Sequence, residues 1–175
     1  MAVVDDLHPG PRGRRARPMS WPAYAAAATA FTFAVVSLYW GLGGTAGLGT
    51  LGGELEELAR RRDPLLIGLT WAAVVLKALG GLLALALGQA WGRRFPRWLL
   101  LTAAWGGSAM LTPYGGAQMA GAALVELGVV HVDGPVDRAA LRWHLMLWDL
   151  WFLVWGLLLG LAASRYTRAT ATSER

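Results

Sequence analysis

Cysteine is absent from the 175-residue sequence, and charged residues are scarce. Without cysteine the chain can form no disulfide, no thiolate zinc site and no cysteine-ligated iron–sulfur cluster, and it has no thiol nucleophile. Charged residues make up only 15% of the chain, whereas a typical soluble domain contains about a quarter. Because 55% of the residues are hydrophobic, the composition also excludes a chain that is disordered throughout.

Lysine is almost absent as well: Lys77 is the only lysine among 16 basic residues, and the net charge is +5. A soluble protein with this excess would suggest nucleic acid as a partner. Here, however, most arginines stand just outside long apolar runs, which is where basic residues signal membrane topology. We therefore expect a lipid bilayer as the surroundings of this chain and no nucleic acid as a partner.

Four apolar runs are long enough to cross a membrane, which requires about 20 mostly apolar residues. The expected spans are residues 21–43, 65–90, 98–118 and 143–163. They predict an all-α fold, an integral membrane bundle of four transmembrane helices over residues 21–163, with a basic, disordered tail before it (1–20) and a short tail after it (164–175). Pro113 is expected to kink or break the third run, so that the chain beyond residue 117 does not continue as a straight rod.

The placement of arginine predicts the orientation of the bundle. Ten arginines lie in the N-terminal tail, in the turn between the second and third spans and in the C-terminal tail, all on one side of a four-span bundle. The side with more basic residues is normally cytoplasmic. We therefore expect a multi-pass protein of the plasma membrane with both termini in the cytoplasm.

The first outer loop is expected to carry a short helix on the membrane surface. Residues 41–53 include seven glycines, and leucines recur at helical spacing through the segment that follows. Together with its charged residues, segment 54–62 therefore predicts an amphipathic helix. Asp63 then suits the N-cap of the second span, and Pro64 suits its first helical position.

Two charged residues, Lys77 and Asp149, fall inside expected spans, each on a face rich in the small residues by which membrane helices pack. At 1.5 Å per residue, Lys77 lies about 18 Å and Asp149 about 12 Å from the outer boundary. A lysine stem can cover that difference, whereas either charge alone in lipid would cost about 2.5–3.5 kcal/mol. We therefore predict that the two side chains pair inside the bundle, directly or through one water or hydroxyl.

Three further polar residues, Tyr39, Tyr114 and His144, lie within about 5 Å of the same boundary by this measure. We expect them to rim a small outward-facing vestibule with Lys77 and Asp149 at its floor, and these five residues form the candidate polar site. Two interpretations stay open: a buried pair that only fixes helix register, or a site or path for an ion, proton or substrate. The sequence points to no catalytic residue, metal site or cofactor.

Three functions are compatible with these residues. The first is a non-enzymatic membrane protein that binds a partner or a small amphiphile in the outer half of the bundle. The second is a minimal proton-coupled transporter that uses Lys77, Asp149 and His144. The third is a membrane enzyme acting on a lipid or terpenoid with Asp149 as the acid. Because four short helices enclose little space, we also expect a homo-oligomer or a membrane protein partner.

Two runs of sequence are similar to a known family. Leu38 to Gly47 (LYWGLGGTAG) closes the first span, and Arg142 to Phe152 (RWHLMLWDLWF) opens the last. Together they resemble hallmarks of domain of unknown function 3995, a family of small four-helix bacterial membrane proteins. The resemblance implies a multi-pass protein of a bacterial plasma membrane and no particular activity. Many members of that family have histidine in place of Ser37, so any role of that histidine would be missing here.

Overall fold

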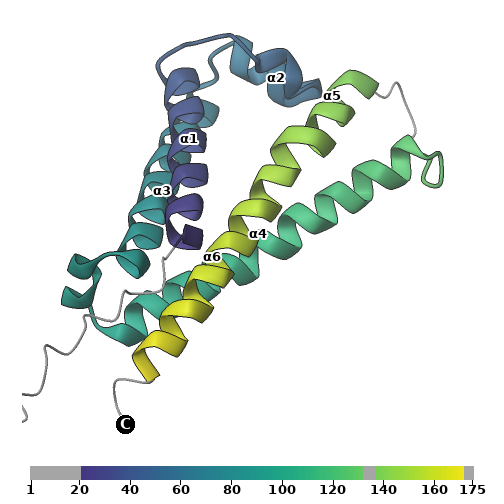
Figure 1. The fold of residues 1–175 in the computed structure, drawn as a ribbon. Helices are drawn as coiled ribbons and strands as arrows, with labels where there is room; N and C mark the ends of the chain where they lie inside the picture. The colour runs from purple at the N-terminus through teal and green to yellow at the C-terminus, as the bar shows by residue number, and fades with distance from the viewer. Residues whose placement is uncertain (1–20, 132–136, 172–175) are drawn as a thin grey trace, which may run out of the picture.

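The computed structural model describes residues 21–131 and 137–171, which are almost entirely helical and contain no β-strand. The expected disordered tail, residues 1–20, lies outside the described residues. The all-α prediction is confirmed (Figure 1). The elements are α1 (Trp21–Gly41), η1 (Leu48–Thr50), α2 (Gly53–Arg60), α3 (Pro64–Gly88), η2 (Ala90–Arg94), α4 (Arg97–Glu126), α5 (Arg138–Trp143), η3 (His144–Trp148) and α6 (Asp149–Ala171).

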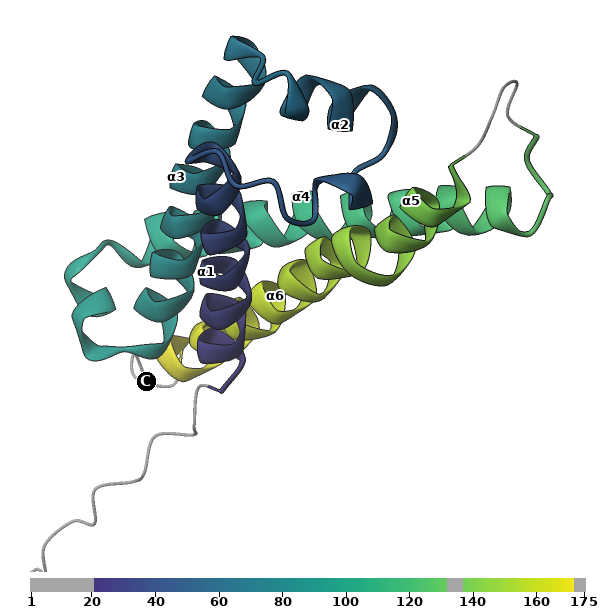
Figure 2. The ribbon, with the colours of Figure 1, turned by 90° about the horizontal axis from the view of Figure 1, so that it is seen from above.

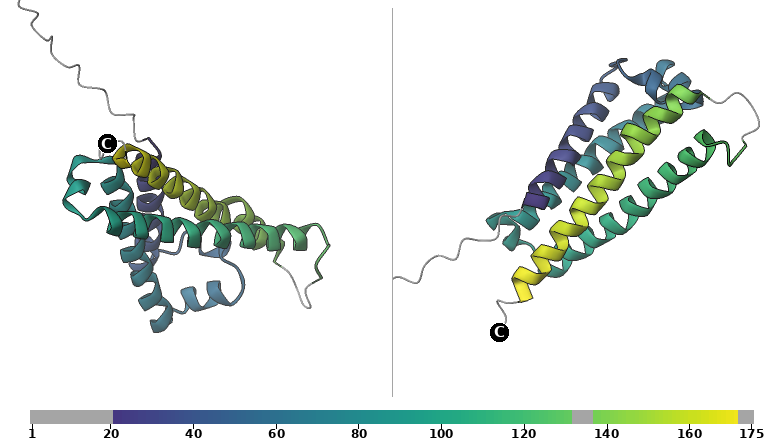
Figure 3. Two further views of the ribbon diagram at one scale, coloured as in Figure 1. Left: turned by 90° about the horizontal axis from the view of Figure 1, so that it is seen from below. Right: turned by 45° about the vertical axis from the view of Figure 1, so that its right-hand side comes forward.

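The long helices form two hairpins. One pairs α1 with α3, the other pairs α4 with α6, and the two hairpins cross at an angle (Figure 2). Contacts between α1 and α6 join them, including a hydrogen bond of 3.1 Å from Trp151 Nε1 to the carbonyl oxygen of Thr29. On the second hairpin, α5, η3 and α6 follow one another as a single helical rod beside α4 (Figure 3).

Three helical stretches of the described chain are long and apolar enough to cross a membrane. They are Trp21–Gly41, Pro64–Gly88 and Arg138–Ala171, and each contains most of one predicted span. The remaining predicted span lies within α4, which is not among the three. The many glycines of α4, with Ser108 and Thr112, lower its hydropathy.

The expected kink or break at Pro113 is wrong, because α4 continues as one helix from Arg97 to Glu126 and Figure 3 shows no sharp bend in it. Pro113 lies on the exposed face of α4. On the opposite face, Ser108 and Gly115 bind the helix to α6 before and after the proline. Packing along α6 therefore overrides the local preference of proline for a break.

Glycines bring α4 and α6 into backbone contact. A Cβ atom added to Gly115 would lie 2.5 Å from the amide nitrogen of Leu153, and one added to Gly156 would lie 2.7 Å from that of Thr112. Ser108 Oγ also donates a hydrogen bond of 2.8 Å to the carbonyl oxygen of Gly156. Close approach of this kind is how helices associate in lipid, where no hydrophobic effect drives them together.

The first hairpin packs through alanines instead. The face of α1 toward the core is made of residues that are almost completely buried, namely Ala23, Ala26, Ala27, Ala30 and Ala34. On α3, Gly81 leaves room for the ring of Phe31, whose atoms lie 2.8 Å from the position of an added Cβ. The half of this hairpin that lies away from α2 is therefore tightly packed.

The short helix predicted at residues 54–62 is confirmed as α2. Its C-terminus forms a Schellman motif, with hydrogen bonds from Arg62 N to Ala59 O (3.2 Å) and from Asp63 N to Leu58 O (3.0 Å). This arrangement places Arg62 in the left-handed region, with φ of 53°. Asp63 Oδ1 then caps α3 by accepting two backbone amides at 3.0 Å each, as predicted.

Candidate functional site

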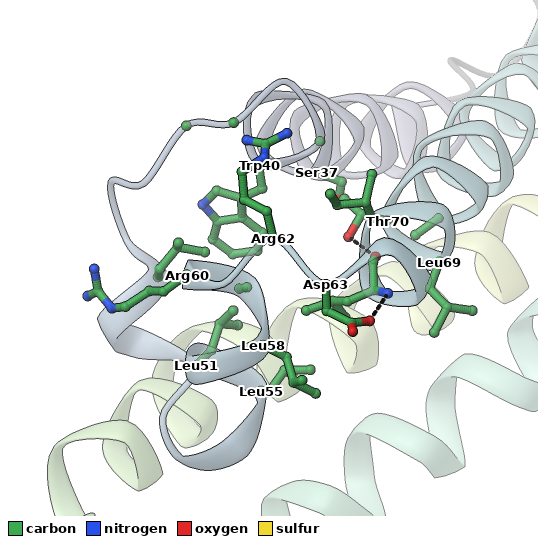
Figure 4. Close-up of a pocket in the computed structure, with 18 of the residues that line it drawn as sticks. Ser37, Trp40, Leu51, Leu55, Leu58, Arg60, Arg62, Asp63, Leu69 and Thr70 are labelled. Carbon is green, nitrogen blue, oxygen red and sulfur yellow. Dashed lines mark hydrogen bonds between the residues drawn. The ribbon is translucent and has the colours of Figure 1, made fainter.

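A cavity of about 300 Å³ lies beneath α2, between the C-terminal end of α1 and the N-terminal end of α3 (Figure 4). Its volume is at the lower end of the range for ligand pockets. Most of its lining is aliphatic and comes from the loop between α1 and α2, from α2 and from α3, namely Leu48, Leu51, Leu55, Leu58, Leu66, Ile67 and Leu69. This cavity is not the predicted vestibule, because Lys77 is the one residue of the predicted five that lines it.

Tyr39 and Trp40 shape the loop that forms part of the cavity wall. Trp40 Nε1 donates a hydrogen bond of 2.9 Å to the carbonyl oxygen of Ala46, and Tyr39 Oη accepts one of 3.1 Å from the amide of the same residue. These two bonds fold the loop back over the end of α1. Trp40 lines the cavity, whereas Tyr39, which was expected at its rim, does not.

Lys77 provides the positive charge at the deep end of the cavity. Side chains of a helix lean toward its N-terminus, and the cavity lies at the N-terminal end of α3, so the side chain of Lys77 leans toward the cavity. Lys77 Nζ donates a hydrogen bond of 2.7 Å to Ser37 Oγ of α1. It also lies 3.5 Å from the centre of the Phe33 ring, a cation–π contact. Both Ser37 and Lys77 line the cavity.

The outer edge of the cavity carries Arg60, Arg62 and Asp63 (Figure 4). Arg60 pairs with Glu56 one turn earlier, at 2.7 Å. The guanidinium of Arg62 lies against Gly43, in space that a side chain at that position would fill. The left-handed turn at Arg62 thus directs its guanidinium, a cation besides those of Arg60 and Lys77, toward Gly43 in the loop between α1 and α2.

A direct ion pair between Lys77 and Asp149, one of the two predicted arrangements, is not found among the described residues. Lys77 bonds Ser37, and Asp149 Oδ1 lies 3.6 Å from His144 Nδ1. The ring of Phe33 contacts the Lys77 ammonium and also stacks on Trp148, the neighbour of Asp149 in sequence. Each charged side chain therefore has a nearer partner of its own, and the other predicted arrangement, a contact through one water or hydroxyl, stays a prediction.

A π-helical turn brings His144 and Asp149 together. In η3 the amide of Asp149 bonds the carbonyl of His144, five residues earlier, instead of the carbonyl four residues earlier as in an α-helix. The wider turn places the two side chains next to each other on one face. Asp149 is only 4% exposed, and among the described residues His144 is the one basic side chain within ion-pair distance of its carboxylate.

The same π-turn contacts the loop between α1 and α2. Trp148 Nε1 donates a hydrogen bond of 3.1 Å to Thr50 Oγ1, and His144 Nε2 lies 3.3 Å from the carbonyl oxygen of Leu51. The rings of Trp40 and Trp148 are 5.2 Å apart. The two sequence runs that resemble the known family are therefore in contact, and their contact fixes the loop over the cavity.

Tyr114 does not belong to this site. It is half exposed on α4 and packs edge-on against Phe152, with ring centres 5.3 Å apart. Of the five predicted residues, only Lys77 lines the cavity. His144 and Asp149 form a separate pair behind the loop segment of residues 48–52, which we call the roof of the cavity. Sequence reasoning missed Phe33 and the hydroxyl of Ser37, whose roles depend on contacts between distant helices.

Comparison with known proteins confirms the resemblance. Residues 30–159 match the family described as "Protein of unknown function (DUF3995)". Because the match covers well over half of the sequence, the chain belongs to this family. No curated protein and no solved structure matches the chain.

Proposed function

We propose that this member of the DUF3995 family is a multi-pass membrane protein that binds a small amphiphile with an acidic group in the cavity beneath α2. One observation carries the proposal, the ammonium of Lys77 at the end of a leucine-lined cavity. The leucines suit an apolar body, and the ammonium suits a carboxylate, sulfonate or phosphate.

The surroundings of Lys77 support an acidic ligand group. An ammonium has three N–H donors, and the acceptor that faces it is the single hydroxyl of Ser37. The remaining donors are compatible with an acidic oxygen that reaches the deep end of the cavity. A charge-assisted bond formed there, away from water, is stronger than the same bond at the surface.

Binding is tested on purified protein in nanodiscs with a fluorescent alkyl sulfonate and with the alcohol of the same chain length. We expect the sulfonate to bind more tightly than the alcohol. Lys77→Met should weaken sulfonate binding by about tenfold or more, because a hydrogen bond to a charged group is lost. It should leave binding of the alcohol almost unchanged.

Arg61→Met is the matched control for this experiment. Arg61 follows α2 directly but does not line the cavity, and its partner is the exposed Glu57 at 3.3 Å. The control should bind the sulfonate as the unchanged protein does. Equal loss of binding in both variants would mean that general charge attraction, and not the cavity, holds the probe.

The same proposal includes a topology. We propose that α4 crosses the membrane as a fourth span, in the plasma membrane of a bacterium and with both termini inside. The distribution of arginine and the close pairing of α4 with α6 support it. Because the chain has no cysteine of its own, single cysteines introduced at Gly49 and Arg94 report the two sides. A membrane-impermeant thiol reagent should label only the first in intact cells, and labelling of the second would contradict the topology.

Proton-coupled transport is the second candidate, and the pair of His144 and Asp149 favours it. Ionisable residues buried inside membrane helices often lie on proton paths. The test is proton uptake into liposomes that contain the protein and the alkyl sulfonate. Transport requires uptake that Asp149→Asn abolishes, whereas binding alone predicts no uptake in either protein.

A further inference from the structure

We propose that His144 is a positioning residue that closes the roof of the cavity when its imidazole carries two protons. The inference rests on the cavity described above as the binding site, and it adds a proton-dependent regulation of that site. It follows from the two partners of the ring.

Both partners of His144 are hydrogen-bond acceptors. The carboxylate of Asp149 lies 3.6 Å from Nδ1, and the carbonyl oxygen of Leu51 lies 3.3 Å from Nε2. While Asp149 is ionised, its carboxylate has no proton to donate, and neither has a backbone carbonyl. A neutral imidazole has one N–H and can serve only one of them, whereas the imidazolium has two and can serve both.

The carbonyl that His144 bonds belongs to the roof. Leu51 and Leu48 line the cavity, and between them Thr50 accepts its bond from Trp148. Gly52 lies so close to Ala140 of α5 that a side chain at Gly52 would collide with it. These contacts join one short loop segment to α5 and η3. A neutral ring gives its one N–H to the charged carboxylate of Asp149, the stronger acceptor, and the bond to Leu51 is then lost. A proton taken up by His144 therefore closes the roof, and its release loosens it.

Asp149 is the one ionisable group within ion-pair distance of His144 among the described residues. Lys77 of α3 bonds Ser37 instead. The other titratable groups on elements packed near η3 have partners elsewhere: Glu126 of α4 pairs with Arg142 of α5, Asp137 caps α5, and Tyr114 contacts Phe152. Protonation of His144 therefore acts on the bond to Leu51 and on the pair with Asp149.

The first test measures binding of the fluorescent alkyl sulfonate at about pH 5.5 and about pH 7.5, on either side of the usual titration of histidine. The sulfonate stays ionised throughout. We expect binding to be about tenfold tighter at the lower pH, the factor that corresponds to one bond from a charged donor. His144→Gln cannot gain a proton, so its affinity should stay at the level that the unchanged protein has at the higher pH.

His131→Gln is the matched control, since His131 is exposed beyond the end of α4. It should keep the full pH dependence. A profile in His144→Gln equal to that of the unchanged protein would overturn the proposal, as would a profile that His131→Gln alone abolishes.

The second test needs no ligand and therefore separates the two proposals. Leu51→Cys keeps the backbone carbonyl that His144 bonds and places a thiol on the inner side of the roof. Its rate of labelling should rise with pH more steeply when His144 is present than in the double variant with His144→Gln. If the sulfonate binds at neither pH but this difference is found, the roof contact is supported and the amphiphile is wrong. If the rates are equal, the roof proposal is wrong.

Discussion

The α4–α6 pair and the end of the α1–α3 pair next to α2 use their glycines in different ways. In the first pair, added Cβ atoms at Gly115 and Gly156 would lie within 2.7 Å of backbone atoms of the partner helix. In the second, an added Cβ at Gly41 would lie 3.4 Å from the ring of Trp71, and one at Gly68 would meet no atom within 4 Å.

The atoms that a glycine faces therefore decide how closely two helices approach each other. Where it faces backbone, the helices meet and no cavity forms. Where large side chains such as Trp40, Leu66 and Leu69 stand between the elements, the space between them remains as the cavity. The same residue type thus gives a close helix pair on one side of the protein and borders a cavity on the other.

The largest effect is expected where the tight pair is forced apart. In Gly115→Ala the new methyl group would lie 2.5 Å from Leu153 N and 2.7 Å from Asp149 O, and backbone atoms cannot move aside locally. We expect a loss of about 1–3 kcal/mol or more, as for other overpacked sites. The measurement is the temperature at which the detergent-solubilised protein loses its folded, monodisperse state.

Gly116→Ala is the control at the next position of α4, where an added Cβ meets no atom within 4 Å. It should be neutral or slightly stabilising, because alanine favours a helix over glycine. Equal effects of the two substitutions would show that α4 and α6 are not in backbone contact in the membrane protein.

A smaller difference in stability is expected between the loss of the Ser37 hydroxyl, which links α1 to α3, and the loss of the Ser108 hydroxyl, which links α4 to α6. Ser37→Ala leaves the Lys77 ammonium without its oxygen acceptor and should cost about 1–3 kcal/mol. Ser108→Ala removes a bond to the Gly156 carbonyl, which keeps its bond within α6, and should cost about 1 kcal/mol or less. The same thermal assay compares them.

The double variant Ser37→Ala with Lys77→Met tests the reason for this difference. If the cost of Ser37→Ala comes from the stranded charge, removal of the charge should recover most of the lost stability. A loss in the double variant as large as the sum of the two single losses would instead assign the cost to packing around Ser37.

The smallest effect is expected outside both pairs. Arg142 bonds Glu126 through Nε at 3.0 Å and Nη2 at 2.9 Å, and its side chain is 61% exposed. Exposed ion pairs contribute little, so Arg142→Gln should cost less than about 1 kcal/mol and even less at high salt. A loss comparable with that of Gly115→Ala would mean that the junction of α4 and α5 matters as much as the glycine contact.

The helices follow from local sequence signals, and for that reason they could be predicted. Apolar runs of sufficient length gave α1, α3 and α6, the leucine spacing gave α2, and Asp63 with Pro64 gave the start of α3. Pro113 misled because the penalty of a proline is local, whereas the contact with α6 that outweighs it comes from residues much later in the chain.

The site could be predicted only in part, because its geometry depends on η3. In a regular helix His144 and Asp149 would point about 140° apart, since successive residues turn by about 100°. Nothing in the spacing of the sequence signals the π-turn that places them together. Lys77 has two partners, Phe33 and Ser37, and both belong to α1. Their contacts with Lys77 depend on how α1 packs against α3.

The turn after α2 holds the one positive φ that the described residues show outside glycine, the 53° of Arg62. Glycine adopts this angle at no cost, whereas a residue with a side chain is strained there. The two hydrogen bonds that end α2 hold the angle, and at this angle the guanidinium lies against Gly43. One strained backbone angle therefore decides where a charged side chain stands relative to the loop that lines the cavity.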